Sequence, residues 1–175
     1  SVAIDGSARG LNFPVVRQAG TVCDPQHWAR PGAKPCSLGV AGTFRGRMTA
    51  SDSGADLGVV HGIYLGRLDV TTATHAPVCL ETGGTFTYVV FDARGHSLGS
   101  VIALLDQSDS EVCQRVAGST ARTYFLRADP VSGSGIFAGA SGGNWLVTGS
   151  GTAISPLSGL SRAHLGLTGL LADRE

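Results

Sequence analysis

Charged side chains are scarce in this chain, and neither sign is in excess. Asp, Glu, Lys and Arg make up 15% of the 175 residues, and the formal net charge is zero. In a typical globular domain about a quarter of the residues are charged. Because no basic block is present to neutralise phosphates, we do not expect nucleic acid as a partner.

Long hydrophobic runs are also missing. No stretch reaches the roughly 18 consecutive apolar residues of a membrane-spanning helix, so we expect no membrane span. The sequence begins at Ser1 without a basic segment followed by an apolar one. Combined with its cysteine content, this predicts a secreted or extracytoplasmic protein whose signal peptide has already been removed.

The common catalytic signatures are not found. No Gly-x-Ser-x-Gly elbow is followed by Asp and His in hydrolase order, and neither a Walker loop nor an HExxH motif occurs. The glycines near residue 140 lack the following helix that a dinucleotide-binding fingerprint needs. These absences disfavour the usual hydrolase, kinase and dehydrogenase classes, and we expect no cofactor.

Four cysteines are present, none of them in a CxxC pair: Cys23, Cys36, Cys79 and Cys113. An even number with such spacing is typical of two disulfides formed in an oxidising compartment. Three pairings are open, and pairing of sequence neighbours is the simplest, giving Cys23–Cys36 and Cys79–Cys113. Free buried thiols are the alternative. A zinc site built on Cys23, His27 and Cys36 lacks a clear fourth ligand, so we expect no metal.

Glycine is abundant in this chain, with 26 residues. In residues 133–151 (GSGIFAGASGGNWLVTGSG) large apolar residues stand between the glycines, so this segment is not a flexible linker. Glycine within a strand marks a bulge, a barrel corner or a close backbone approach. The segment therefore predicts a strongly curved β-structure.

Turns separate strand-like segments from residue 38 onward, without a convincing amphipathic helix. Such strands suit a closed antiparallel barrel better than a sandwich, since closure removes exposed edges. We predict an all-β, closed antiparallel eight-stranded barrel at residues 38–175, preceded by an irregular, disulfide-pinned N-terminal arm at residues 1–37. The predicted strands are residues 38–50, 58–72, 85–92, 97–106, 120–128, 134–138, 144–152 and 161–171.

Residues 135–142 (GIFAGASG) and the following WLVTG segment resemble the allene oxide cyclase-like and dirigent-like barrel proteins, in particular bacterial secreted members. The resemblance implies a barrel whose apolar central cavity holds a hydrophobic substrate in one conformation while it cyclises or couples. It also implies a homo-oligomer, a dimer or a trimer. The expected activity is a cyclase or isomerase that needs no cofactor.

Candidate functional residues come from titratable and aromatic side chains within the predicted strands. As catalytic candidates we take Tyr64, Tyr88 and Arg122, because phenols and a guanidinium can stabilise developing charge. The alternative for each tyrosine is a barrel-wall position whose hydroxyl bonds to backbone. The candidate ligand-binding residues are Phe44, Arg47, Phe91, Tyr124 and Trp145.

Three hypotheses on function follow from this fold. The first is the cyclase or isomerase, and the second is a secreted carrier of a small hydrophobic molecule in the same cavity. The third is a structural or interaction protein whose barrel is filled by side chains. The lining of the cavity distinguishes them, because catalysis needs convergent polar groups and a carrier does not.

Overall fold

The structure is a computed structural model that describes residues 1–15, 36–70, 78–114, 116, 119–140, 145–155 and 160–169. Within these ranges no helix is long and apolar enough to cross a lipid bilayer. The described elements are β1 (Val2–Val15), β2 (Cys36–Ala50), β3 (Asp56–Val70), β4 (Val78–Phe91), β5 (Ser97–Leu105), the 3-10 helix η1 (Gln107–Asp109), β6 (Glu111–Gln114), β7 (Ala121–Gly135), β8 (Trp145–Ser155) and β9 (Leu160–Gly169).

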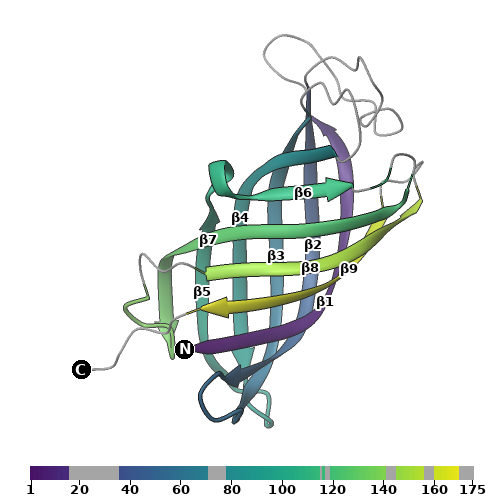
Figure 1. Cartoon of the computed structure of the whole chain (residues 1–175). Coiled ribbons are helices and arrows are strands. Elements are labelled where there is room, and N and C mark those ends of the chain that lie inside the picture. Colours follow the sequence, from purple (N-terminus) through teal and green to yellow (C-terminus); the bar gives the residue numbers. More distant parts are fainter. Residues whose placement is uncertain are drawn as a thin grey trace.

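The strands close into an antiparallel barrel (Figure 1). β1 pairs with both β2 and β9, and β3 pairs with β4, so the described strands leave no open edge. The short β6 continues β5 along the same side of β4: β5 pairs with residues 84–91 and β6 with residues 78–81. Nine strands therefore fill eight positions, which confirms the predicted all-β, eight-stranded barrel.

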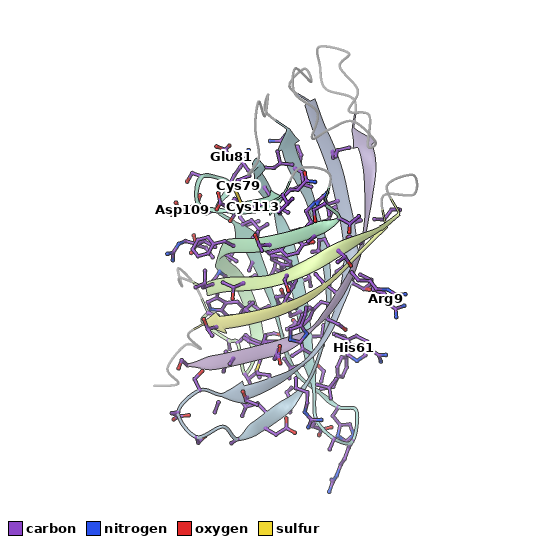
Figure 2. The ribbon with its side chains drawn as sticks, turned by 45° about the vertical axis from the view of Figure 1, so that its right-hand side comes forward. Arg9, His61, Cys79, Glu81, Asp109 and Cys113 are labelled. Carbon is purple, nitrogen blue, oxygen red and sulfur yellow. A yellow bond between two sulfur atoms is a disulfide. The ribbon has the colours of Figure 1, made fainter. Side chains whose placement is uncertain are left out.

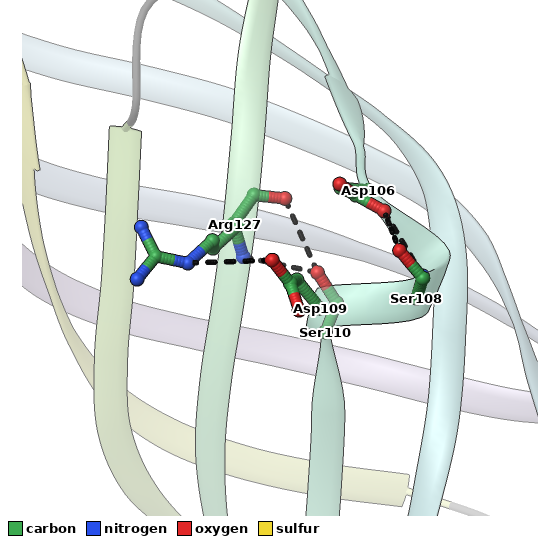
Figure 3. A network of polar contacts seen from close by, with 5 residues as sticks. All are labelled: Asp106, Ser108, Asp109, Ser110 and Arg127. Carbon is green, nitrogen blue, oxygen red and sulfur yellow. Dashed lines mark hydrogen bonds and ion pairs between the residues drawn. The ribbon is translucent and has the colours of Figure 1, made fainter.

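A local hydrogen-bond network holds the break between β5 and β6 (Figure 3). Asp106 caps η1, since its Oδ1 accepts bonds from the Ser108 amide at 3.0 Å and the Ser108 hydroxyl at 2.7 Å. Ser110 bonds to β7 in both directions: its hydroxyl donates to the Arg127 carbonyl at 3.1 Å and accepts from the Arg127 amide at 2.9 Å. Asp109 forms an ion pair with Arg127 at 3.9 Å. The chain therefore leaves β4 briefly and returns to it as β6.

Alternation along the strands separates the interior from the outer face. On β2, for example, Leu38, Phe44 and Met48 are buried, whereas Arg45 and Arg47 between them are exposed. Apolar side chains from all the long strands meet in one core in this way. The alternation with a period of two that marks a half-buried strand in the sequence therefore determines which strand side chains point into the barrel and which point outward.

Aromatic side chains fill one end and the middle of the barrel. Phe137, in the turn after β7, and Trp145, at the start of β8, are both fully buried, with ring centroids 6.0 Å apart. In the middle, Tyr88 stacks on Phe86 at 5.7 Å and meets the edge of Phe44 at 5.8 Å. We call the end holding Phe137 and Trp145 the sealed end.

The predicted irregular arm is wrong for its first part, because Val2–Val15 forms β1 and closes the barrel. Val2, Ile4 and Ala8 point into the core. Interior positions on this strand include glycine and alanine, so the apolar alternation is too faint to mark a strand. Residues 16–35, which hold the rest of the arm, lie outside the described residues.

The predicted strand at residues 134–138 is also wrong beyond Gly135. Gly135 has φ +59°, a left-handed conformation that favours glycine, and residues 136–139 form a turn. A Cβ at Gly135 would overlap the Leu98 carbonyl oxygen of β5. The turn that we placed at Ser141-Gly142-Gly143 lies outside the described residues.

Candidate functional site

Polar interior side chains gather at the end of the barrel opposite the sealed end. Tyr64 on β3, Gln114 on β6, and Arg122 and Tyr124 on β7 all occupy inward positions there. We call these four residues the polar-end cluster. Two of the predicted catalytic residues and one predicted ligand-binding residue are thus at the same end of the barrel.

Glycines on two neighbouring strands make room for Tyr64. A Cβ at Gly42 of β2 would overlap its ring, and a Cβ at Gly10 of β1 would overlap its hydroxyl oxygen. The same Cβ at Gly10 would lie only 3.0 Å from the hydroxyl oxygen of Ser161 on β9. On its other side the Tyr64 ring packs against Phe86, with centroids 5.8 Å apart. The Tyr64 side chain therefore extends along the inner face of the barrel from β3, over the glycines of β2 and β1, toward β9.

Arg122 and Gln114 are tied to the backbone at the start of β7. Arg122 donates through Nη1 to the carbonyl oxygens of Ser119 at 2.8 Å and Ala121 at 2.9 Å. Gln114 Nε2 donates to the same Ser119 carbonyl at 2.6 Å. These bonds hold two long polar side chains in place, which reduces the rotamer entropy that ligand binding would cost.

Burial determines the protonation of the cluster. It raises the pKa of Tyr64 to about 12, with a smaller contribution from the charge of Tyr124. Burial likewise raises the pKa of Tyr124, opposed by the nearby Arg122 cation. Burial lowers the pKa of Arg122, while Tyr124 raises it, and a guanidinium stays protonated in proteins. At neutral pH the cluster therefore offers one cation and two neutral phenols.

We expect the tyrosines to ionise late. Tyr64, Tyr88 and Tyr124 are all the tyrosines of the chain, and burial raises the pKa of each. The pKa of each tyrosine is higher in the folded chain than the unfolded value of about 10, so the neutral, buried phenols stabilise the folded state, and they do so fully below pH 10. For Tyr64 this stabilisation is lost as the pH rises to about 12.

An ultraviolet titration of tyrosinate absorbance tests this expectation. Near pH 10 the native protein should be clearly less ionised than the same chain in guanidinium chloride, which should be about half ionised there. A native signal equal to that of the denatured chain at pH 10 would contradict the burial of these phenols.

The remaining candidate residues lie elsewhere. Tyr88 and Phe44 are buried in the middle of the barrel, and Trp145 is at the sealed end. Arg47 lies on the outer face in an ion pair with Asp56. Phe91 is also on the outer face, where its ring meets that of His61 at 5.5 Å. The barrel interior thus brings together only part of the predicted set.

The disulfide Cys79–Cys113 is formed, as the pairing of sequence neighbours predicts (Figure 2). It joins directly opposed residues of β4 and β6. The Glu111 carboxylate lies within 4.8 Å of both sulfur atoms, but these sulfurs are bonded to each other and do not act as thiolate ligands. Cys23 and the side chain of Cys36 lie outside the described residues, so their pairing stays a prediction.

Gln114 is the member of the polar-end cluster that the sequence analysis missed. It follows Cys113 in a four-residue strand, which is too short to show an alternation. Its position becomes evident only when β6 is placed beside β7.

A depression of about 340 Å³ lies on the outer surface, lined by Leu65, Gly66, Arg67, Gly83, Gly84 and Gln107. It is separated from the polar-end cluster by the barrel wall.

Comparison of the chain with family models, curated proteins and solved structures finds no match.

Proposed function

We propose that this chain binds a small, largely apolar molecule that carries an anionic or hydrogen-bond-accepting group, and that the polar end of the barrel takes that group. The asymmetry of the interior carries the proposal. Phe137 and Trp145 fill one end, whereas Tyr64, Gln114, Arg122 and Tyr124 stand at the other. A few convergent polar groups beside an apolar wall are typical of ligand sites.

The chemistry of the cluster favours an acidic or carbonyl head group. Arg122 is a cation, and Tyr64 and Tyr124 are neutral hydroxyl donors at neutral pH. Among the described interior residues there is no Asp or Glu, so those residues supply no negative charge that would repel an anion. The apolar body of the ligand would rest on side chains such as Val40 and Phe86.

A cofactor-independent cyclase or isomerase is the second candidate. The cluster itself favours it, because a guanidinium and phenol donors can stabilise negative charge that develops on a substrate oxygen. Its raised pKa makes each phenol a poor base at neutral pH, which supports a stabilising role over proton abstraction. We favour binding over catalysis because the cation and hydroxyl donors of the polar-end cluster are sufficient to hold a head group, whereas catalysis also requires that they accelerate a reaction of the ligand.

The Cys79–Cys113 bond supports an extracytoplasmic location, since disulfides persist in oxidising compartments. A carrier or enzyme there would meet its ligand outside the cytoplasm.

Two fluorescent probes test the site, the anionic anilinonaphthalene sulfonate and the neutral phenylnaphthylamine. Removing the cation with Arg122→Met should weaken binding of the sulfonate roughly 10- to 100-fold, the value of a charge-assisted hydrogen bond. Binding of the neutral probe should change far less. The matched control is Arg94→Met, which removes an exposed arginine from the turn between β4 and β5.

Equal effects of the two substitutions would contradict the proposed site. So would an Arg122→Met protein that binds both probes as tightly as the unsubstituted chain. Native mass spectrometry of the purified protein can then identify a ligand retained from the host, and turnover of that ligand would favour the enzyme over the carrier.

A further inference from the structure

The outer surface of β2, β3, β4 and β5 carries a face without charge. Its members form two complete rows across the four strands in register: Thr43, Ile63, Thr87 and Ile102, and beside them Ala41, Leu65, Thr85 and Leu104. We call these eight residues the apolar face. Ile63 and Leu65 are each 61% exposed, Ile102 41% and Leu104 45%. Exposed apolar patches of this kind usually mark interaction sites.

The relief of the apolar face is regular. Large side chains stand on β3 and β5, whereas the shorter Thr85 and Thr87 lie between them on β4, and Ala41 and Thr43 lie on β2. Two ridges therefore alternate with two lower strands. Such a surface can receive a copy of itself if ridges meet lower strands.

We propose that the apolar face binds a second copy of this chain, about a two-fold axis that runs parallel to the strands between β3 and β4. This axis places β3 of one copy over β4 of the other, and β5 over β2. Ile63 then faces Thr87 of the other copy, and Leu65 faces Thr85. Every ridge packs into a lower strand, as an isologous interface requires.

The charges at the border select this axis. Arg45 and His61 border the apolar face at one end, where Arg45 Nη2 lies 3.5 Å from His61 Nε2. Figure 2 shows His61 on the outside of the barrel. Under the proposed axis Arg45 faces Ser100 and His61 faces Val89, both without charge. A two-fold axis perpendicular to the strands would instead set ridge on ridge and bring Arg67 toward the other copy's Arg45.

The other border of the apolar face carries both signs of charge. Arg67 stands there close to the proposed axis and donates to Gln107 of its own chain at 3.4 Å. Under this axis Arg67 faces Gly83 of the other copy, two residues along β4 from the exposed Glu81, so a carboxylate as well as the second guanidinium lies near it. Because the barrel is convex, contact is confined to about four strands. Since a standard interface uses roughly 20–30 residues a side, we expect a weak dimer.

Sedimentation equilibrium over a range of concentrations tests the proposal. We expect a monomer–dimer equilibrium with a roughly micromolar dissociation constant, which Leu65→Lys weakens at least about tenfold by burying a charge. Val116→Lys is the matched control, because Val116 is 65% exposed and lies outside the apolar face. A chain that is monomeric at every concentration overturns the proposal, and so does a dimer that tolerates Leu65→Lys.

Cross-linking tests the axis itself. A mixture of Thr43→Cys protein and Ile102→Cys protein should form a disulfide-linked heterodimer under mild oxidation with dissolved oxygen, which is reduced as the two thiols lose their hydrogens. Each protein alone should cross-link much less, because the proposed axis sets Thr43 opposite Ile102 and leaves each about three strand spacings from its own copy. Equal cross-linking of Thr43→Cys protein with itself would overturn the proposed arrangement.

Discussion

Replacing Trp145 with alanine should destabilise the barrel by about 3–5 kcal/mol, the usual cost of removing a buried aromatic side chain. The indole is fully buried, packs against Phe137, and lies where a Cβ at Gly169 of β9 would fall. No small adjustment of the closed wall can refill that volume. Since domains are stable by only about 5–15 kcal/mol, this single change removes a large part of the total.

Chemical denaturation followed by far-ultraviolet circular dichroism measures the loss. The control is Phe125→Ala, because Phe125 is 40% exposed on the outer face and should cost much less. An unchanged midpoint for Trp145→Ala would mean that the sealed end does not hold the barrel together. The folded fraction should still bind the anionic probe, because the polar-end cluster lies at the opposite end.

The barrel could be predicted from the sequence because most of its strands alternate clearly. On β2 the inward residues are apolar or glycine, while arginine and threonine are among those that point outward. That pattern specifies both a strand and its buried face. Glycine-rich strands also indicated strong curvature, and glycines such as Gly42 do lie where another side chain needs the space.

Orientation fails where both faces of a strand are apolar. The run Tyr88-Val89-Val90-Phe91 has no polar residue to mark the outside, so Phe91 was expected in the cavity. The register of β4 places Tyr88 and Val90 inside and hence Phe91 outside. Arg47 was expected to bind the ligand, but it lies on the outer face in an ion pair with Asp56. The strand pattern around an arginine does not show whether such a partner is present on the surface.

The polar-end cluster could be predicted only in part, because it depends on how distant strands align. Tyr64, Arg122 and Tyr124 were chosen for their chemistry, and only the pairing of strands around the barrel brings them to one end. Gln114 depends on the break between β5 and β6, which the Asp106 amide and the Ser110 hydroxyl stabilise by donating to the carbonyl oxygen of the distant Arg127. A sequence pattern carries no such long-range information.

Removing the Cys79–Cys113 bond is the second change with a large expected effect. The two cysteines are 34 residues apart, and closing a loop of that length is worth about 3–4 kcal/mol in the chain-entropy model. We expect the Cys79→Ser, Cys113→Ser protein to lose about that much stability on denaturation. Substitution is preferable to a reductant because the chain has four cysteines.

The loss should be felt first at β6. This strand has four residues and pairs with only four positions of β4 and three of β7, so the disulfide is a major part of its attachment. Hydrogen exchange of residues 111–114 should therefore accelerate more than exchange in β2 or β3. Because β6 carries Gln114, whose amide shares the Ser119 carbonyl with Arg122, binding of the anionic probe should weaken as well. Unchanged exchange in β6 would show that the strand is held by its ladder alone, and would separate the disulfide from the proposed site.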